Sequence, residues 1–265
     1  MSTLVCLHAH PDDECIITGG SIARAVAEGH RVVLVVATNG DHGEIPADLA
    51  LGETLVDRRR VETEASAAIL GVARIVWLGY SDSGMTGWAQ NQHPEALMNA
   101  HVDEAAHKLV QVLDDENAAV LTGYDWHGGY GHPDHIAVHR VARRAAALRP
   151  GVAHFEATMN RDRFRQAITM AREAGALSEE DAWDPDGPAD DGNPMGSLES
   201  EISLMVDVSA YVAKKRAAVM CHASQVTDSG FFSTMPEDRF AWMFGTEWFI
   251  APGDTGAMRA GWLFA

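Results

Sequence analysis

Residues 3–40, TLVCLHAHPDDECIITGGSIARAVAEGHRVVLVVATNG, give the clearest indication of the architecture. This stretch opens with a short apolar run (3–9), passes through Pro and acidic residues, and then shows apolar residues at helical spacing. A run rich in β-branched residues (31–40) follows and ends at Asn-Gly. Because both apolar runs are continuous rather than alternating, the stretch predicts a βαβ unit with two buried parallel strands.

The same alternation of strands and helices continues to about residue 160. The expected helices cover residues 55–71, 98–116 and 135–149, and the expected strands cover residues 73–79, 118–124 and 152–159. Such alternation is typical of an α/β fold with a Rossmann-like, mostly parallel sheet and helices on both faces. Further along the chain we expect a helix over 210–224 and a late strand over 247–251.

The size and composition of the chain favour one domain. The 265 residues and 46% hydrophobic content suffice for a single α/β domain spanning 1–265, although the length alone also permits two small domains. Residues 178–200 interrupt the pattern, since they are rich in Asp, Glu, Pro and Gly, and no Lys or Arg occurs between Arg172 and Lys214. We predict a mobile acidic loop there in preference to an ordered lid.

The charge and the cysteines restrict the partners and the compartment. A formal net charge of −18 disfavours nucleic acid and anionic membranes as partners. No apolar run reaches membrane-spanning length, and the first residues lack the basic segment of a signal peptide. Three widely spaced cysteines, Cys6, Cys15 and Cys221, indicate a reducing compartment, so we expect a cytoplasmic protein. The sequence leaves homo-oligomer formation open.

Two copies of the tripeptide His-Pro-Asp mark the expected functional site. AHPDDE (9–14) follows the first strand, and GHPDH (131–135) lies between a later strand and its helix. Ligands of open parallel sheets bind beyond the carboxyl ends of the strands, so both turns are expected to face one crevice. A single His-Pro-Asp is as well explained by a turn with a helix cap, but two of them at strand ends of one sheet favour a metal site.

The spacing within each turn predicts the ligands. His10 and Asp13 are three positions apart, so on a first helical turn they would share a face and reach one divalent ion, with Asp12 beside the metal. His132 and His135 have the same spacing, and one of them would complete the set. Two histidines and one carboxylate, with the fourth position left to water, are typical of a catalytic zinc site.

These motifs resemble the PIG-L/LmbE-like family of zinc-dependent N-deacetylases. The most specific matches are AHPDDE and GGYGHPDH (128–135). Further similar stretches are TNGDHGE (38–44), RRVETEASAAILG (59–71), LGYSDSGM (78–85) and VDVSAYVAKKRAAVMCHASQ (206–225). The likeness covers most of the chain and is greatest to the mycothiol-pathway deacetylases and amidases, which hydrolyse an amide on a glucosamine-inositol scaffold.

The resemblance implies a metal centre. It assigns one Zn²⁺ per chain to His10, Asp13 and His135, with another divalent ion such as Fe²⁺ as the alternative. The chain departs from the family at DWHGG (125–129), where relatives often carry Asp-Pro and a polar residue. This departure bears on the substrate rather than on the chemistry.

The resemblance also implies the catalytic residues. Asp12 matches the general base that takes a proton from water. His132 matches a histidine that stabilises the tetrahedral intermediate when protonated. Asp134 matches the carboxylate that keeps this imidazole charged, since a neighbouring anion raises the pKa of a histidine. Tyr130 matches a tyrosine that points into the oxyanion site.

The predicted activity is amide hydrolysis. We expect removal of an N-acetyl or other N-acyl group from an amino sugar or its glycoside, which would be the small-molecule partner. The alternative is an amidase that cleaves a larger thiol-conjugate or natural-product amide. A metal-binding regulator without turnover is disfavoured, because it would not need Asp12, His132 and Asp134 beside its ligands. A nicotinamide dehydrogenase is also disfavoured, because no G-x-G-x-x-G follows the first strand.

Other polar positions have two interpretations each. Arg58, Arg59 and Arg60 are expected on a solvated helix face in preference to a phosphate or hydroxyl site. Asp82 fits a sugar contact and a turn cap equally well. His222 is expected outside the site, with a contribution from the C-terminal segment as the alternative.

Overall fold

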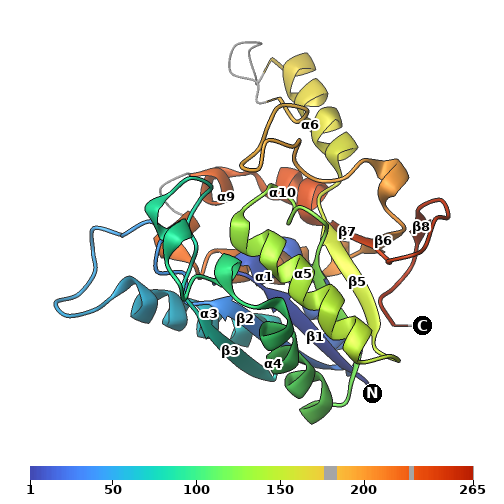
Figure 1. Ribbon diagram of the computed structural model, residues 1–265. Helices are drawn as coiled ribbons and strands as arrows, with labels where there is room; N and C mark the ends of the chain where they lie inside the picture. Colours follow the sequence, from blue (N-terminus) through green and yellow to red (C-terminus); the bar gives the residue numbers. More distant parts are fainter. Residues whose placement is uncertain (176–183, 227–229, 265) are drawn as a thin grey trace.

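One sheet organises the protein. The computed structural model describes residues 1–175, 184–226 and 230–264, and within them eight strands form this sheet (Figure 1). The strands are β1 (Thr3–His8), β2 (Arg31–Thr38), β3 (Arg74–Tyr80), β4 (Ala118–Tyr124), β5 (Ala153–Thr158), β6 (Leu204–Asp207), β7 (Thr246–Ile250) and β8 (Arg259–Ala260). Their order is β3-β2-β1-β4-β5-β7-β6-β8. The first five strands run parallel, whereas β7 is antiparallel to both of its neighbours.

Helices cover both faces of the sheet. They are α1 (Asp13–Ile17), α2 (Gly19–Ala27), α3 (Leu55–Leu70), α4 (Val102–Asp115), α5 (Pro133–Leu148), α6 (Arg161–Glu173), α7 (Val212–Val219), α8 (Ala223–Val226), α9 (Phe231–Thr234) and α10 (Glu237–Phe244). The core on one face contains Leu109 of α4 and Val138 of α5, and the core on the other contains Ile22 of α2, Leu70 of α3 and Val219 of α7. The predicted Rossmann-like fold is therefore confirmed.

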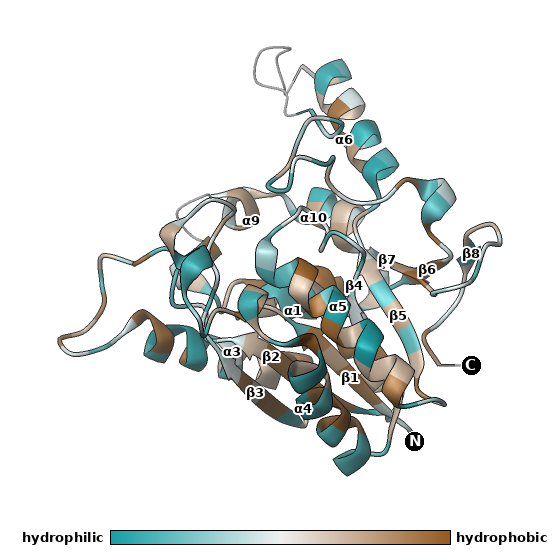
Figure 2. Ribbon diagram, in the orientation of Figure 1, coloured by the Kyte–Doolittle hydropathy of each residue, from teal (hydrophilic) through white to brown (hydrophobic). Residues whose placement is uncertain are grey.

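Burial on both faces explains why the sequence of strand β1 is continuously apolar. Val5 and Leu7 face the core under α4 and α5, whereas Leu4 and Cys6 face the core on the opposite side, and all four are fully buried. The hydrophobic colouring of β1 and β2 in Figure 2 follows this burial on two faces. A strand covered on both sides needs no polar alternation, and it can hold the turn that follows it in a fixed position.

The structure adds elements that the sequence pattern does not predict. Every expected element up to residue 160 forms within a few residues of its expected bounds, and β7 corresponds to the expected late strand. The expected helix over 210–224 is divided into α7 and α8. Helices α6 and α10 and the short strands β6 and β8 were not expected. In the part of the chain that the structure describes, each helix is too short or too polar to cross a bilayer.

The acidic segment 178–200 lies partly outside the described residues, which resume at residue 184. From there the segment packs against the loop that follows β4. The backbone N–H of Asp190 donates to the carbonyl oxygen of Tyr130 (3.0 Å), and that of Gly196 donates to Gly129 (2.6 Å). The described part therefore contributes to the surroundings of the second His-Pro-Asp turn, and mobility of the whole loop stays a prediction.

Candidate active site

The two His-Pro-Asp turns meet because β1 and β4 are neighbours in the sheet. Both strands run parallel, so their carboxyl ends lie at the same edge. In the second turn His132 is the N-cap of α5, Pro133 occupies the first turn of that helix, and His135 follows in the same turn. Proline is favoured there, because its fixed φ suits a helix and its missing N–H would have had no helical partner.

The first turn differs from the expectation. Helix α1 begins at Asp13 and Asp12 is its N-cap, so His10 precedes the helix instead of sharing its first turn. The backbone of Asp12 has φ 110°, in the positive region that residues other than glycine rarely adopt. A hydrogen bond from the backbone N–H of His10 to Asp13 Oδ2 (2.8 Å) closes the turn and brings the two residues together.

Three side-chain atoms form a compact triangle, here called the donor triangle: His10 Nδ1, Asp13 Oδ2 and His135 Nε2. Its edges are 3.4 Å from His10 to Asp13, 3.4 Å from His135 to Asp13 and 3.2 Å between the two histidines. Tetrahedral zinc with bonds of about 2.0–2.1 Å requires ligand atoms about 3.3–3.4 Å apart. The donor triangle thus has the dimensions of one face of a zinc tetrahedron.

In both histidines of the donor triangle, the second ring nitrogen has a hydrogen-bond acceptor as its partner, which leaves a lone pair on the nitrogen inside the triangle. His10 Nε2 lies 3.1 Å from a carboxylate oxygen of Asp134, and His135 Nδ1 lies 3.0 Å from the carbonyl oxygen of Gly128. Both partners can only accept, so these nitrogens carry the protons. His10 Nδ1 and His135 Nε2 are then unprotonated in the neutral rings, as metal binding requires.

The charge around His10 also suits a cation. Burial lowers the pKa of His10, but the carboxylates of Asp82, Asp13 and Asp134 outweigh this effect and raise the pKa well above its usual value. The three carboxylates thus favour a positive charge at this position. A divalent ion would balance the same surplus of negative charge. Two wider groupings that include His10 and His132 could also hold an ion, with ligand atoms within 4.8 Å of one another.

Asp12 lies beside the donor triangle and pairs with Arg59. Arg59 Nη2 donates to Asp12 Oδ2 (3.2 Å) and to the carbonyl oxygen of Pro11 (2.5 Å). Burial raises the pKa of Asp12 to about 6, although Arg59 opposes the shift. Arg59 is only 3% exposed, so the expected solvated face is wrong for this residue. Arg58 does lie at the surface, where it pairs with Glu53 (2.7 Å).

The structure changes the expected relation between Asp134 and His132. The fully buried carboxylate of Asp134 accepts from His10 and from the backbone N–H and hydroxyl of Ser83, so its histidine partner is His10, a candidate ligand, rather than His132. His132 Nδ1 instead accepts from the backbone N–H of Asp134 (3.1 Å). Burial and the neighbouring His10 and His135 lower the pKa of His132 to about 2. Both features favour a neutral ring with its proton on Nε2 over the expected charged imidazole.

A cleft of about 270 Å³ gives access to these residues. Its lining includes His10, Asp12, Asp13, His42, Glu44, Arg59, Asp82, Met85, Trp88, Tyr130 and His132. The Tyr130 ring packs edge-on against His135, with 4.9 Å between ring centroids. Burial raises the pKa of the Tyr130 hydroxyl, so it keeps its proton and can donate. Asp82 lies 3.6 Å from His10 Nε2, inside the site.

Comparison with known proteins identifies the family. Residues 5–146 match the PIG-L family, which is described as GlcNAc-PI de-N-acetylase. The chain belongs to this family. The resemblance seen in the motifs is confirmed, and so is the expected enzyme class, an amide-hydrolysing N-deacetylase. Both His-Pro-Asp turns lie within the matched region.

The similarity to one relative extends over nearly the whole chain. The 1D-myo-inositol 2-acetamido-2-deoxy-α-D-glucopyranoside deacetylase of Nocardioides sp. is 37% identical and covers 97% of this chain and 94% of its own length. This similarity includes the C-terminal part, which lies beyond the region matched to the family.

Solved structures share the fold at lower identity. The N,N′-diacetylchitobiose deacetylase of Pyrococcus horikoshii is 22% identical, with a TM-score of 0.59 over 94% of this chain and 82% of its own. The 4-carboxy-2-hydroxymuconate hydratase GalB of Pseudomonas putida is 17% identical, with a TM-score of 0.60 over 98% and 100%. One fold thus accommodates a deacetylase and a hydratase, so the fold alone does not define the reaction.

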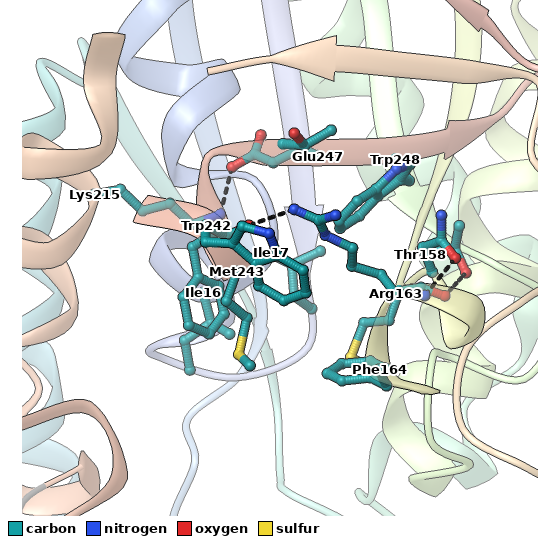
Figure 3. A pocket seen from close by; sticks show the side chains of 14 residues that line it. Ile16, Ile17, Thr158, Arg163, Phe164, Lys215, Trp242, Met243, Glu247 and Trp248 are labelled. Atoms are coloured by element: carbon teal, nitrogen blue, oxygen red, sulfur yellow. Dashed lines mark hydrogen bonds and ion pairs between the residues drawn. The ribbon is translucent and has the colours of Figure 1, made fainter. Parts of the chain in front are cut away.

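A second, mostly apolar pocket lies near α1 (Figure 3). Its walls include Ile16 and Ile17 of α1 and the indole of Trp242. The charged groups on its walls already have partners: Lys215 pairs with Glu247, and the Arg163 guanidinium stacks on Trp242 and donates to its carbonyl oxygen. The cleft lined by His10 and Asp13 of the donor triangle is therefore the candidate active site of this PIG-L protein.

Proposed function

We propose that this protein removes the N-acetyl group from an amino-sugar glycoside of the glucosamine-inositol type. The donor triangle beside the Asp12 carboxylate carries the proposal, because such a set could hold a metal ion next to a base. His10, Asp12 and Asp13 line one cleft, and His135 Nε2 lies 3.2 Å from His10 and 3.4 Å from Asp13. The family and the name of the Nocardioides relative support the substrate class. A larger thiol-conjugate or natural-product amide is the alternative substrate.

The donor triangle supports a zinc centre. His10, Asp13 and His135 would hold the ion, and Asp134 would orient His10 from behind. A bound zinc ion supplies Lewis acidity to the amide carbonyl and lowers the pKa of coordinated water to about 7. The mixed nitrogen and oxygen donors and the spacing of about 3.3 Å support zinc over Ca²⁺ or Mg²⁺, which prefer six or more oxygen ligands.

Asp12 would act as the general base. Its carboxylate lines the cleft beside the donor triangle, and Arg59 favours its ionised form while fixing one of its oxygens. A base must come within about 2.6–3.2 Å of the proton that it takes. Having taken a proton from water, Asp12 would be the acid that returns it to the leaving amine.

Two donors would stabilise the tetrahedral intermediate. His132 has its Nδ1 occupied by the backbone N–H of Asp134, so its Nε2–H is available to an oxyanion in the cleft. The protonated hydroxyl of Tyr130 is a second candidate donor on the same cleft wall. Loss of one oxyanion donor typically reduces turnover by about 10²–10³-fold.

The rest of the cleft suits a neutral, hydroxyl-rich substrate. Asp82 and Glu44 offer acceptors, and His42 offers a further polar group. Carboxylates facing the cleft would repel an anionic substrate but accept hydrogen bonds from sugar hydroxyls. The exposed indole of Trp88, 47% accessible at the same cleft, provides an apolar surface for a sugar ring.

Acetate release tests the function. The zinc-loaded protein is incubated with N-acetylglucosaminyl-inositol, with free N-acetylglucosamine and with acylated thiol conjugates, and acetate and free amine are measured by mass spectrometry. We expect acetate from the inositol glycoside, with a higher kcat/KM than for the free sugar. Cleavage of the thiol conjugates alone would favour the alternative, and no turnover of any of them would contradict the proposal.

Two properties of the whole protein belong to the same proposal. The three cysteines are free, which supports a cytoplasmic location. Homo-oligomer formation stays an open expectation, and analytical ultracentrifugation of the purified chain would decide it.

A further inference from the structure

The turn that carries Asp12 needs support from its surroundings. Its positive φ places the backbone in a region that non-glycine residues persist in only when neighbouring contacts hold them there. The direction of the Asp12 carboxylate depends on this backbone conformation. Whatever fixes the turn therefore also fixes the candidate base.

A buried carboxylate provides this support. The backbone N–H of Asp12 donates to Glu14 Oε2 (2.9 Å). The other oxygen of Glu14, Oε1, accepts from Ser66 Oγ (2.6 Å) and from His222 Nε2 (2.8 Å). Glu14, Ser66 and His222 are all fully buried. Without water to compete, these hydrogen bonds decide which way the Glu14 carboxylate points.

His222 reaches Glu14 from the far end of the chain. It lies between α7 and α8, 208 positions after Glu14. The neighbouring residues of the same segment have other partners: Ser224 donates to Glu62 on α3 through its backbone N–H (2.8 Å) and its hydroxyl (2.6 Å). Gln225 bonds the backbone of Glu44 at the cleft rim. The side chain of His222 therefore contacts Glu14, which supports the Asp12 turn, whereas Ser224 and Gln225 bind Glu62 and Glu44.

We propose that His222 is a positioning residue for the Asp12 base, an inference that rests on the proposed function. By donating to Glu14 Oε1, His222 fixes the carboxylate that receives the Asp12 N–H. Without this donor, Glu14 keeps only Ser66 on that oxygen and can rotate away from the turn. A displacement of about 1 Å at a reacting group can cost about 10²-fold in rate. The donor triangle would stay intact, because its hydrogen bonds do not involve His222.

The test compares three variants of the full chain. His222→Phe keeps a planar ring without a donor, and His222→Gln keeps a donor near the position of Nε2. Ser224→Ala is the matched control, since it loosens the same segment without touching Glu14. Zinc content, kcat and KM are measured together with hydrogen exchange of the Asp12 backbone amide, a readout that needs no substrate.

We expect His222→Phe to lower kcat by about 10–100-fold, with zinc content and KM close to wild type and faster exchange of the Asp12 amide. His222→Gln should recover most of kcat and of the protection, and Ser224→Ala should resemble wild type. If His222→Phe fails to fold, Ser66→Ala removes the other donor to Glu14 Oε1 and should show a smaller loss of the same kind.

The inference and the proposed function can fail separately. An inactive wild type would contradict the function, while amide exchange would still report on His222. Unchanged exchange in both His222→Phe and Ser66→Ala would overturn the inference. So would an equal loss of kcat in Ser224→Ala, because it would show that His222 only anchors the C-terminal segment.

Discussion

The two His-Pro-Asp turns have the same three residues in different environments. Asp12, in the first turn, lines the cleft beside Arg59 and has its pKa raised by burial to about 6. Asp134, in the second turn, is fully buried and accepts hydrogen bonds from His10 and Ser83. One aspartate thus faces the cleft, and the other supports a candidate metal ligand.

The backbone accounts for this difference. Pro133 starts α5 directly, so Asp134 lies in the first helical turn and its side chain is directed inward. In the first turn the helix starts later, and the positive φ of Asp12 turns its side chain away from the direction that a helical residue would take. A shared tripeptide therefore predicts that two turns contribute to one site, but not what each aspartate does there.

The largest expected effect comes from breaking the donor triangle. His10→Ala, Asp13→Ala and His135→Ala should each deplete bound zinc and lower kcat/KM by more than about 10³-fold, because several kcal/mol of charge stabilisation are lost. His42→Ala, in the same cleft, is the control and should keep the ion. Elemental analysis measures the metal, and full occupancy in all three variants would refute the site.

Asp12→Asn tests the role of the first turn. The amide cannot accept a proton but has the same shape, so zinc content should stay unchanged while kcat falls by about 10²–10⁴-fold. Metal analysis and steady-state kinetics on the same preparation check this. A loss of zinc with a normal rate per bound ion would show that Asp12 is a ligand rather than the base.

Asp134→Asn tests the second turn by the matching substitution. The change removes the charge behind His10, and we expect a loss of about 10–100-fold in zinc affinity or activity, as is usual for residues that orient a ligand. Competition with a zinc chelator measures the affinity. If Asp134→Asn kept its zinc affinity but lost as much kcat as Asp12→Asn, the two aspartates would not have the different roles assigned to them here.

The smallest expected effect is a shift in pH dependence. Asp12 works as a base only when ionised, so kcat/KM should fall as the pH drops through about 6 or somewhat lower, since a bound cation favours the carboxylate. Arg59→Gln removes a charge that lowers the pKa of Asp12, so this limb should move to higher pH. His132 is already neutral above its pKa of about 2, so His132→Ala should lower the maximum without moving the limb. A limb that moves in His132→Ala but not in Arg59→Gln would contradict this assignment.

The sequence predicts the fold best where burial dictates the pattern. Strands β1 and β2 are covered on both faces, and their continuous apolar runs identify them. Helix α6 has apolar residues at helical spacing, such as Phe164, Ala167 and Ile168, but none of its residues is buried and six of its thirteen residues are charged, which obscures the pattern. Strand β8 has only two residues, too few for any periodicity.

In the site, residues of the two turns could be named from the sequence, but their partners could not. The contacts of Ser83 with Asp134 and of His222 with Glu14 join residues far apart in the chain. Local spacing carries no information on such pairs. Arg59 illustrates the opposite error, because a helix rich in charge indicated a solvated face while this guanidinium is buried and donates to the carbonyl oxygen of Pro11 and to Asp12.

The place of β4 next to β1 has a consequence for synthesis. All three atoms of the donor triangle belong to the first 135 residues, whereas the segment with His222 follows much later. Chains emerge from the ribosome N-terminus first, and their domains generally fold as units in that order. A nascent chain consequently contains all three side chains of the donor triangle before it contains His222, so the candidate ligands and the residue proposed to align the base enter the folding domain at different times of synthesis.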